Sequence, residues 1–339
     1  MQLSITFQGM LSAVRGQCWQ LVWVSVLALL SSCAAQLDVN ASNQTKPAKP
    51  YLAEKQYASF DGDFLGYRKW EPKQRNPKMI VIGVHGISGY AGDYDNLGKH
   101  FLKQHTDTAL YAADTRGQGM DPVVERRGDI RSPKDWYRDL YTFTGLVRKL
   151  HPKAKVVWFG ESMGSLIVLH AYHHPPHGES KPDALVMASP IIGVDEQLTR
   201  WKYWTAKVSA MLMPRLRVSL ETLSDGQRPV VTKDDIHEQQ AVQNPWYIKQ
   251  YTLRLLLHLS RMSETLGDLA ADTDCPVLVL HGGEDIFTSE ERVKQWFGRF
   301  PADADATRKL YPDSYHLLMY DHERETIFGD VSDWLRKVK

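Results

Sequence analysis

Short apolar segments recur along the chain from residue 51 onward, and longer amphipathic segments separate them. The apolar segments are Met79–Gly86, Ala109–Asp114, Val156–Gly160, Ala184–Pro190 and Pro276–Gly282. Nearly continuous apolar strands of this kind are buried on both faces, as in a parallel sheet that helices cover. Patterns with helical spacing lie at Asp93–Gln104, Pro133–Leu150, Met163–Tyr172, Ser289–Phe300 and Glu323–Lys337. The alternation predicts an α/β fold whose mostly parallel central sheet is flanked by helices.

One long interval, from Pro190 to Cys275, contains no convincing buried strand. Two apolar repeats with helical spacing occur within it: Trp201, Trp204, Val208 and Met211, and then Ile248, Tyr251, Leu255, Leu259 and Met262. Such apolar faces need a surface to lie on, and the top of the sheet offers one. We therefore expect residues 193–265 to form a helical cap, inserted between two parts of a core at residues 51–192 and 266–339.

The N-terminal segment has the arrangement of an export signal. Residues 1–32 carry a single charged side chain, Arg15, and then the apolar run Leu21–Leu30. This run is shorter than the ~20 residues that a membrane-spanning helix needs, and it is typical of a secretory signal peptide. The sequence that ends it, Leu-Ser-Ser-Cys33, resembles the bacterial lipoprotein signal, in which the cysteine is lipidated. An ordinary signal peptide cut near Ala34 is the alternative.

Lipidation of Cys33 would anchor the chain in the bacterial cell envelope. Residues 33–50 would then hold the anchor and a flexible tether, because this stretch has no aromatic and few large apolar side chains. Ala34 after the cysteine is typical of sorting to the outer membrane, where the domain would face the periplasm. With Cys18 removed and Cys33 lipidated, Cys275 would remain alone, so the domain must rely on its hydrophobic core.

Charge and composition exclude some partners. The chain has 41 basic and 40 acidic side chains, a net charge of +1, and gives no electrostatic reason to expect nucleic acid. Its 43% hydrophobic residues suffice for the core of one large domain.

A histidine cluster has spacing that zinc could use: His170, His173, His174 and His177. Because Pro175 and Pro176 interrupt it, we interpret the cluster as a polar helix end and assign no metal.

The segment GESMG, residues 160–164, lies where an apolar strand pattern turns into an apolar helical pattern. Such a turn forces Ser162 into a cramped backbone conformation, and only small neighbours such as Gly160 and Gly164 permit it. The turn lifts the hydroxyl above the sheet, beside the N–H groups of the following helix. The segment predicts a nucleophilic serine, and a tight turn with an incidental serine is the alternative.

A serine hydroxyl needs a base, and the base needs an acid that orients it. In enzymes with this turn, the acid and then the histidine follow the serine along the chain. Asp285 and His316 fit this order, because Asp285 follows the strand predicted at Pro276–Gly282 and His316 follows another predicted to end at Arg308–Tyr311, both at the edge of the sheet where Ser162 lies. The alternatives are Glu284, Asp313 and Asp321 for the acid and His322 for the base.

An oxyanion hole should combine two backbone N–H groups near the serine. Met163 directly follows the serine, and Ile87 lies in the loop after the strand at Met79–Gly86. We expect these two residues to be the donors. His85 and Gly86 would shape the turn, and a second base at His85 is the less favoured alternative.

Several motifs together resemble the monoacylglycerol lipase and lysophospholipase group of α/β-hydrolases, which is also classed with serine aminopeptidases. The motifs are "VHGISGYAGDYDNLGKHF", "AADTRGQGMD", "GESMGSLIVLHA", "CPVLVLHGGEDIF" and "YPDSYHLLMYDHERE". The resemblance runs from about Lys78 to the C-terminus and implies an α/β-hydrolase fold with the roles given above. Glu161 stands where many members have His, and Ser165 where a third Gly is usual. We expect both departures to alter only the pocket floor, and "DTRGQG" (residues 114–119) to be structural.

The resemblance implies a serine hydrolase that cleaves carboxylic esters of lipids, such as monoacylglycerols or lysophospholipids, through an acyl-enzyme and without a cofactor. Part of the apolar surface of the cap would line an acyl channel. An aminopeptidase or small-ester esterase with the same triad is the alternative, because Asp234, Asp235 and Glu238 are available in the cap to hold an amine. A non-catalytic binding protein tethered to the surface is the third interpretation.

Overall fold

The computed structural model describes residues 46–73, 76–104, 107–193, 207–219, 230–233 and 246–338. The predicted signal segment and Cys33 lie outside the described residues, as do Trp201, Trp204 and the three acidic residues of the predicted cap. Within the described residues, no helix is both long enough and apolar enough to span a membrane.

In the described part of the chain, a nine-stranded sheet has the order β1-β2-β3-β5-β4-β6-β7-β10-β11. Its strands are β1 (Tyr51–Leu52), β2 (Gln56–Ala58), β3 (Phe64–Trp70), β4 (Met79–Val84), β5 (Thr108–Ala113), β6 (Lys155–Glu161), β7 (Ala184–Ala188), β10 (Val277–Gly282) and β11 (Ala306–Tyr311). The six strands from β5 to β11 in this order pair in parallel, whereas β1, β2 and β3 pair antiparallel at one edge. The mostly parallel sheet confirms the predicted fold class.

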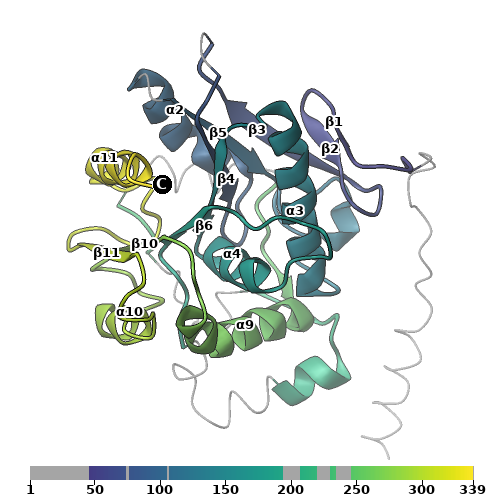
Figure 1. Cartoon of the computed structure of the whole chain (residues 1–339). Helices are drawn as coiled ribbons and strands as arrows, with labels where there is room; N and C mark the ends of the chain where they lie inside the picture. The colour runs from purple at the N-terminus through teal and green to yellow at the C-terminus, as the bar shows by residue number, and fades with distance from the viewer. Residues whose placement is uncertain are drawn as a thin grey trace, which may run out of the picture. The chain divides into compact units, whose positions relative to one another are not determined.

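Helices cover both faces of the sheet (Figure 1). They are α2 (Asp95–Lys103), α3 (Pro133–Leu150), α4 (Met163–His173), α9 (Leu253–Ala271), α10 (Glu290–Phe297) and α11 (Arg324–Leu335), with short 3₁₀ turns η2 (Ala91–Tyr94) and η3 (Val124–Arg126). Each helical pattern predicted outside the cap coincides with one of these helices to within a few residues. At α3 the predicted bounds are reproduced at both ends, and at its start Ser132 caps the helix and Pro133 occupies the first turn.

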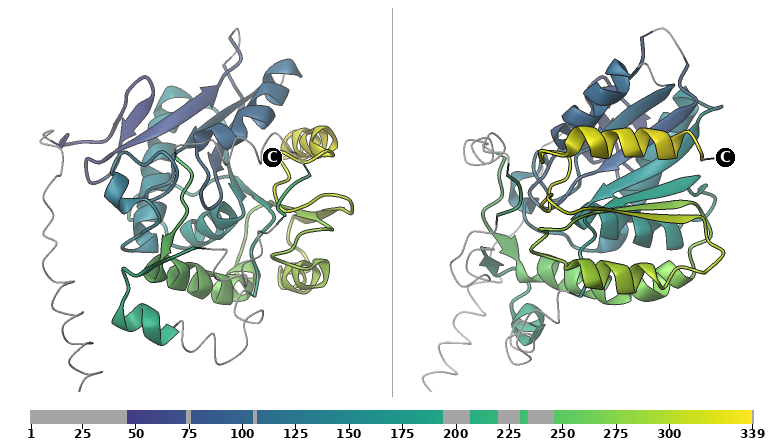
Figure 2. Two further views of the ribbon diagram at one scale, coloured as in Figure 1. Left: turned by 180° about the vertical axis from the view of Figure 1, so that it is seen from behind. Right: turned by 90° about the vertical axis from the view of Figure 1, so that its left-hand side faces the viewer.

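Side chains of the central strands alternate between two hydrophobic clusters. In β6, Val156 and Trp158 belong to the cluster under α3, α4, α9 and α10, whereas Val157 and Phe159 belong to the cluster under α2 and α11. Figure 2 shows these two helical layers on opposite sides of the sheet. Because both faces are covered, the central strands are apolar at almost every position.

The interval after β7 rejoins the core earlier than the sequence predicted. β8 (Arg217–Val218) pairs antiparallel with β9 (Tyr251–Thr252), and α9 begins directly after β9. Tyr251 therefore precedes the helix instead of lying on it. α9 packs on α4 and continues to Ala271, so the predicted boundary at residue 265 falls inside this helix. We call residues 193–252 the insertion.

Candidate active site

Ser162 occupies the tight turn between β6 and α4. Its backbone has φ 56° and ψ −118°, a combination that side-chain-bearing residues rarely adopt. A Cβ at Gly160 would overlap the carbonyl oxygen of Gly164, and a Cβ at Gly164 would overlap that of Val84. Close backbone approach therefore requires both glycines. The cramped turn that the sequence predicted is present.

Three side chains from distant parts of the chain form one hydrogen-bonded series. His316 Nε2 lies 2.8 Å from Ser162 Oγ, and His316 Nδ1 lies 2.8 Å from Asp285 Oδ2. All three side chains are buried. With Asp285 ionised, Nδ1–H donates to the carboxylate, which leaves Nε2 free to accept the proton of the serine hydroxyl. The structure thus brings together the three residues that the sequence analysis singled out.

The surroundings of Asp285 favour its carboxylate form. Burial opposes the charge, but the charge and hydrogen bond of His316 and the N–H of Phe287 outweigh it and lower the pKa of Asp285. The Phe287 N–H donates to Oδ1 at 2.8 Å. His281 Nδ1 lies 3.8 Å from Oδ2, and burial lowers the pKa of this histidine. Asp285 therefore keeps one oxygen directed at His316 and stays negatively charged at neutral pH.

The end of β7 holds both the serine and the histidine. The carbonyl of Ala188 accepts the N–H of Ser162 at 2.9 Å. The hydroxyl of Ser189 donates to the carbonyl of His316 at 2.6 Å, and Ser189 is fully buried, with φ 47°. The sequence analysis missed Ser189. Its position directly after a buried strand, at the edge of the sheet that carries the site, was the available signal.

The two predicted oxyanion residues flank Ser162. Met163 is the first residue of α4, and the N–H groups of a first helical turn have no partner within the helix. Ile87 lies in the loop after β4. A Cβ on its neighbour Gly86 would lie 3.2 Å from Ser162 Cβ and 3.6 Å from Oγ. The backbone of this loop therefore passes directly beside the serine hydroxyl.

The DTRGQG loop, residues 114–119, supports the loop that contains Ile87. Gln118 Oε1 accepts the N–H of Ser88 at 3.1 Å, and Asp114 Oδ1 accepts the N–H of Ala91 at 2.8 Å. These bonds fix the backbone on either side of the turn after β4. The loop thus has the structural role that the sequence analysis gave it.

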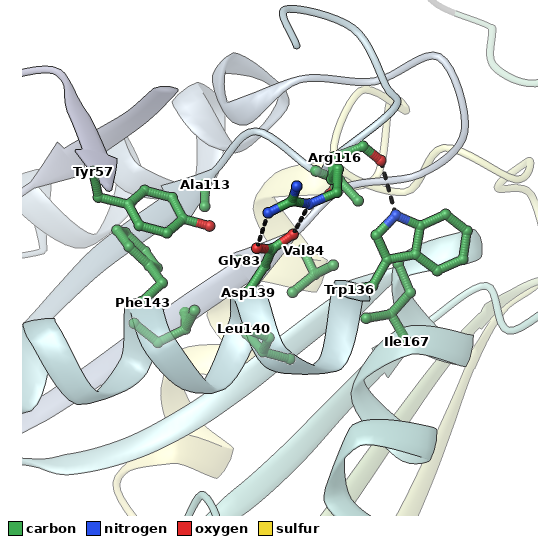
Figure 3. Close-up of a pocket in the computed structure, with 12 residues that line it drawn as sticks. Tyr57, Gly83, Val84, Ala113, Arg116, Trp136, Asp139, Leu140, Phe143 and Ile167 are labelled. Carbon is green, nitrogen blue, oxygen red and sulfur yellow. Dashed lines mark hydrogen bonds and ion pairs between the residues drawn. The ribbon is translucent and has the colours of Figure 1, made fainter. Parts of the chain in front are cut away.

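Arg116 of the same loop is buried among three carboxylates. It donates to Asp61, Asp63 and Asp139 at 2.7–3.0 Å, and its own carbonyl accepts the Nε1–H of Trp136 at 2.8 Å. Figure 3 shows the contacts with Asp139 and Trp136. The cavity beside it holds about 30 Å³, which is room for water but not for an ester. This cavity belongs to the scaffold and is not a substrate pocket.

The residues considered as alternatives have other surroundings. Three of them are exposed at the surface: Glu284, Asp313 and His322. Asp321 is buried, and its Oδ2 accepts the N–H of Tyr315 at 2.6 Å. His85 uses both ring nitrogens for the backbone: Nε2 accepts from Thr115 N–H at 2.9 Å, and Nδ1 donates to the carbonyl of Gly86 at 2.8 Å. None of them contacts Ser162 among the hydrogen bonds of the described chain.

The histidine cluster at the end of α4 is bonded to the protein. His170 Nε2 lies 3.0 Å from the carbonyl of Met262, and His173 Nε2 lies 3.0 Å from Thr273 Oγ1. His174 Nδ1 donates to the carbonyl of His170 at 2.7 Å. Across the described residues, no group of three His, Cys, Asp or Glu side chains has an arrangement that could hold a metal ion.

The insertion reaches the site at two points. Leu317, next to the histidine, donates its N–H to the carbonyl of Val231 at 2.9 Å. The ring of Trp246 stacks on Tyr90, three residues after Ile87, with 6.5 Å between centroids. The described parts of the insertion also expose large apolar side chains: Val208, Met211, Leu212, Met213, Leu216, Val230, Trp246 and Tyr247. Apolar surface is therefore concentrated on the segment that borders the site.

Residues 75–323 match the family described as serine aminopeptidase, S33. A monoacylglycerol lipase of Mycolicibacterium smegmatis is 24% identical over 294 residues, which cover 84% of this chain and 96% of that protein. An uncharacterized abhydrolase domain-containing protein of Dictyostelium discoideum is 24% identical over 278 residues. That alignment covers 82% of this chain but only 28% of the Dictyostelium protein.

A solved structure has the same fold. The soluble variant of monoglyceride lipase from Saccharomyces cerevisiae, in complex with a substrate analog, matches with a TM-score of 0.70 and 19% identity, over 90% of this chain and 99% of that chain. The family match covers most of the chain and includes every residue of the hydrogen-bonded series. The chain therefore belongs to the serine aminopeptidase S33 family, has the α/β-hydrolase fold, and is similar to serine hydrolases of the lipase and esterase type.

Proposed function

We propose that the chain hydrolyses carboxylic esters of lipids, monoacylglycerols or lysophospholipids, with Ser162 as nucleophile, His316 as base and Asp285 as the orienting acid. The observation that carries this proposal is the continuous series of 2.8 Å contacts from Ser162 Oγ through His316 to Asp285. In this series His316 accepts the proton of the Ser162 hydroxyl, and Asp285 fixes the tautomer of His316.

The reaction proceeds in two halves. Ser162 Oγ attacks the acyl carbon while its proton moves to His316 Nε2, and the resulting tetrahedral intermediate expels the alcohol, which takes up that proton. Water then gives a proton to His316 Nε2 and attacks the acyl-enzyme, and the fatty acid leaves as Ser162 regains its hydrogen. Asp285 remains ionised throughout and stabilises the imidazolium each time it forms.

The charge on the carbonyl oxygen needs hydrogen-bond donors in both halves. We assign this role to the backbone N–H groups of Ile87 and Met163, which belong to the two segments that flank Ser162. Donors fixed in place before the reaction stabilise the transition state without reorganisation, and one such donor contributes about 3–4 kcal/mol.

The substrate class is supported by the relatives and by the insertion. The Mycolicibacterium relative is named a monoacylglycerol lipase, and the yeast structure is a monoglyceride lipase with a substrate analog. Exposed apolar side chains on the insertion suit an acyl chain, since each buried methylene contributes about 0.8 kcal/mol. The second candidate, an aminopeptidase, is favoured by the description of the family itself.

A substrate panel separates these candidates. It compares monoacylglycerols, lysophospholipids, p-nitrophenyl esters of increasing chain length and aminoacyl amides, for the wild type, Ser162→Ala and Ser180→Ala. Ser180 is exposed and provides the matched control. We expect kcat/KM to rise from acetyl to at least octanoyl esters, and Ser162→Ala to lose turnover by several orders of magnitude. Highest activity on aminoacyl amides would favour the aminopeptidase, and activity retained by Ser162→Ala would remove the proposed nucleophile.

We also propose that Cys33 carries lipid and anchors the enzyme in the bacterial cell envelope, at the outer membrane facing the periplasm. The support is the sequence around Cys33 and the polar stretch that follows it. A membrane-anchored lipase would meet its substrates in the bilayer or at its surface.

A further inference from the structure

A carboxyl group lies directly behind the candidate nucleophile. Glu161 ends β6 and precedes Ser162, and it is 1% exposed. Its Oε1 is buried and has no hydrogen-bond partner among the described residues. An ionised carboxylate with an unsatisfied oxygen is expensive to bury, whereas a neutral carboxyl is far less so.

The groups that face Glu161 come from two segments, and they do not neutralise it. Asp93 and Tyr94 belong to η2, Tyr320 belongs to the loop after His316, and the backbone N–H of Met319 favours the charged form through a hydrogen bond. Within the described chain, no cation is among the groups that shift the pKa of Glu161, and Arg68 of β3 lies over the ring of Tyr90 at 5.2 Å. Burial, and then the negative charge of Asp93, raise the pKa of Glu161 to about 8.

Asp93 connects the two loops that complete the site. Its Oδ2 accepts the N–H of Tyr90 at 3.0 Å, in the loop that contains Ile87, and its Oδ1 accepts the hydroxyl of Tyr320 at 2.9 Å, in the loop that contains His316. A Cβ at Gly89 would overlap Asp93 Oδ2, so the carboxylate packs directly against the first loop. The charge of Asp93 therefore holds both loops in place.

We propose that Glu161 is a positioning residue that must be protonated for the site to work. While it is neutral, the negative charge of Asp93 holds the loops of Ile87 and His316. When Glu161 loses its proton to solvent base, a second buried negative charge repels Asp93 and weakens its bonds to both loops. The proposal rests on the proposed function of Ser162 and His316, and it adds an alkaline limit to activity that is independent of the triad.

The test is a pH profile from pH 6 to 9.5 of two rates: kcat/KM on p-nitrophenyl butyrate and the rate of Ser162 labelling by a fluorophosphonate. Labelling reports an activated serine whatever the natural substrate is. Both wild-type rates should fall about tenfold per pH unit above a midpoint near pH 8, as expected for one essential ionisation. Glu161→Gln and Glu161→His, which are neutral at alkaline pH, should lose this decline. Glu54→Gln, the same change at an exposed site, should keep it.

The outcomes are distinct. A decline with the same midpoint in folded Glu161→Gln or Glu161→His, or no decline in the wild type, would overturn the role of Glu161. Absence of labelling in the wild type at every pH would overturn the proposed function. If the labelling rate declines with the expected midpoint but no ester is hydrolysed, the role of Glu161 is supported and only the proposed substrate class is rejected. If neither variant folds, the hydrogen-exchange protection factors of wild-type amides 86–94, which correct for the intrinsic rise of exchange with pH, decide. They should fall across the same midpoint, and protection that stays constant would overturn the proposal.

Discussion

Replacing Glu161 with glutamine should also change how the stability of the fold depends on pH. The pKa of Glu161 rises from an ordinary value of 4.5 to about 8 in the folded chain, first through burial and then through the charge of Asp93. Each pKa unit corresponds to 1.36 kcal/mol, so ionising this group in the folded state costs about 5 kcal/mol relative to the unfolded chain. That is a large part of the 5–15 kcal/mol that typically stabilises a domain.

The sign follows from proton binding. Between pH 4.5 and 8 the folded chain keeps the proton on Glu161, while the unfolded chain has released it. Stability that is complete below pH 4.5 is therefore lost as the pH rises toward 8. In Glu161→Gln this contribution is absent, whereas all other groups titrate as in the wild type. The free energy of unfolding of the variant minus that of the wild type should grow by about 4 kcal/mol between pH 5 and pH 9.

Urea unfolding at pH 5, 6, 7, 8 and 9, followed by tryptophan fluorescence, measures this difference. Glu54→Gln is the matched control, and its difference from the wild type should stay constant with pH because Glu54 is exposed. A constant difference for Glu161→Gln would show that the native carboxyl is already ionised or hydrated, and the reasoning from burial would then be refuted. The measurement does not depend on activity, so it tests the burial of Glu161 separately from its proposed positioning role.

Four further changes test other parts of the molecule. Asp285→Asn should lower kcat by about 10⁴ with the fold retained, because the histidine loses its tautomer and orientation, and a loss under tenfold would contradict this. Trp246→Ala should reduce kcat/KM for octanoyl esters more than for acetyl esters, and equal losses would place the acyl chain elsewhere. Leu255→Ala should cost about 2–5 kcal/mol in urea unfolding without changing the chain-length profile, because Leu255 is buried in the core. Cys33→Ser should move the enzyme from the membrane to the soluble fraction, and equal retention in fractionation would point to the insertion as the anchor.

The parts of the fold that could be predicted from sequence are those where both faces of an element are buried. β4, β6 and β10 consist almost entirely of apolar residues, and no other element suits such a short run. β1 and β2 span two and three residues, too few to show any period, and β3 mixes exposed and buried positions at the antiparallel edge. The sequence analysis did not identify these strands for that reason.

The residues of the candidate site also divide into those that the sequence predicts and those that it does not. Ser162, Asp285 and His316 could be found because each follows a recognisable strand, and parallel strands bring their carboxyl ends to one edge. Ser189 and Asp93 could not, because their roles depend on which loops lie next to each other. Ser189 reaches the carbonyl of His316 because β7, β10 and β11 are consecutive in the sheet, so that the loop after β11 passes near the end of β7. That order is a property of the whole sheet and cannot be inferred from neighbouring residues.

Glu161 is the instructive case, because its burial was deducible. The sequence analysis expected Glu161 to alter only the pocket floor. Yet side chains alternate along a strand, so Val157, Phe159 and Glu161 point to the same face of β6. Phe159 lies in the hydrophobic cluster under α2 and α11 together with Met319. A glutamate two positions further along the same covered face is buried, and its carboxyl must either find a cation or keep its proton at neutral pH. What the sequence did not provide was its neighbour, since Asp93 meets Glu161 only once η2 is folded over the end of β6.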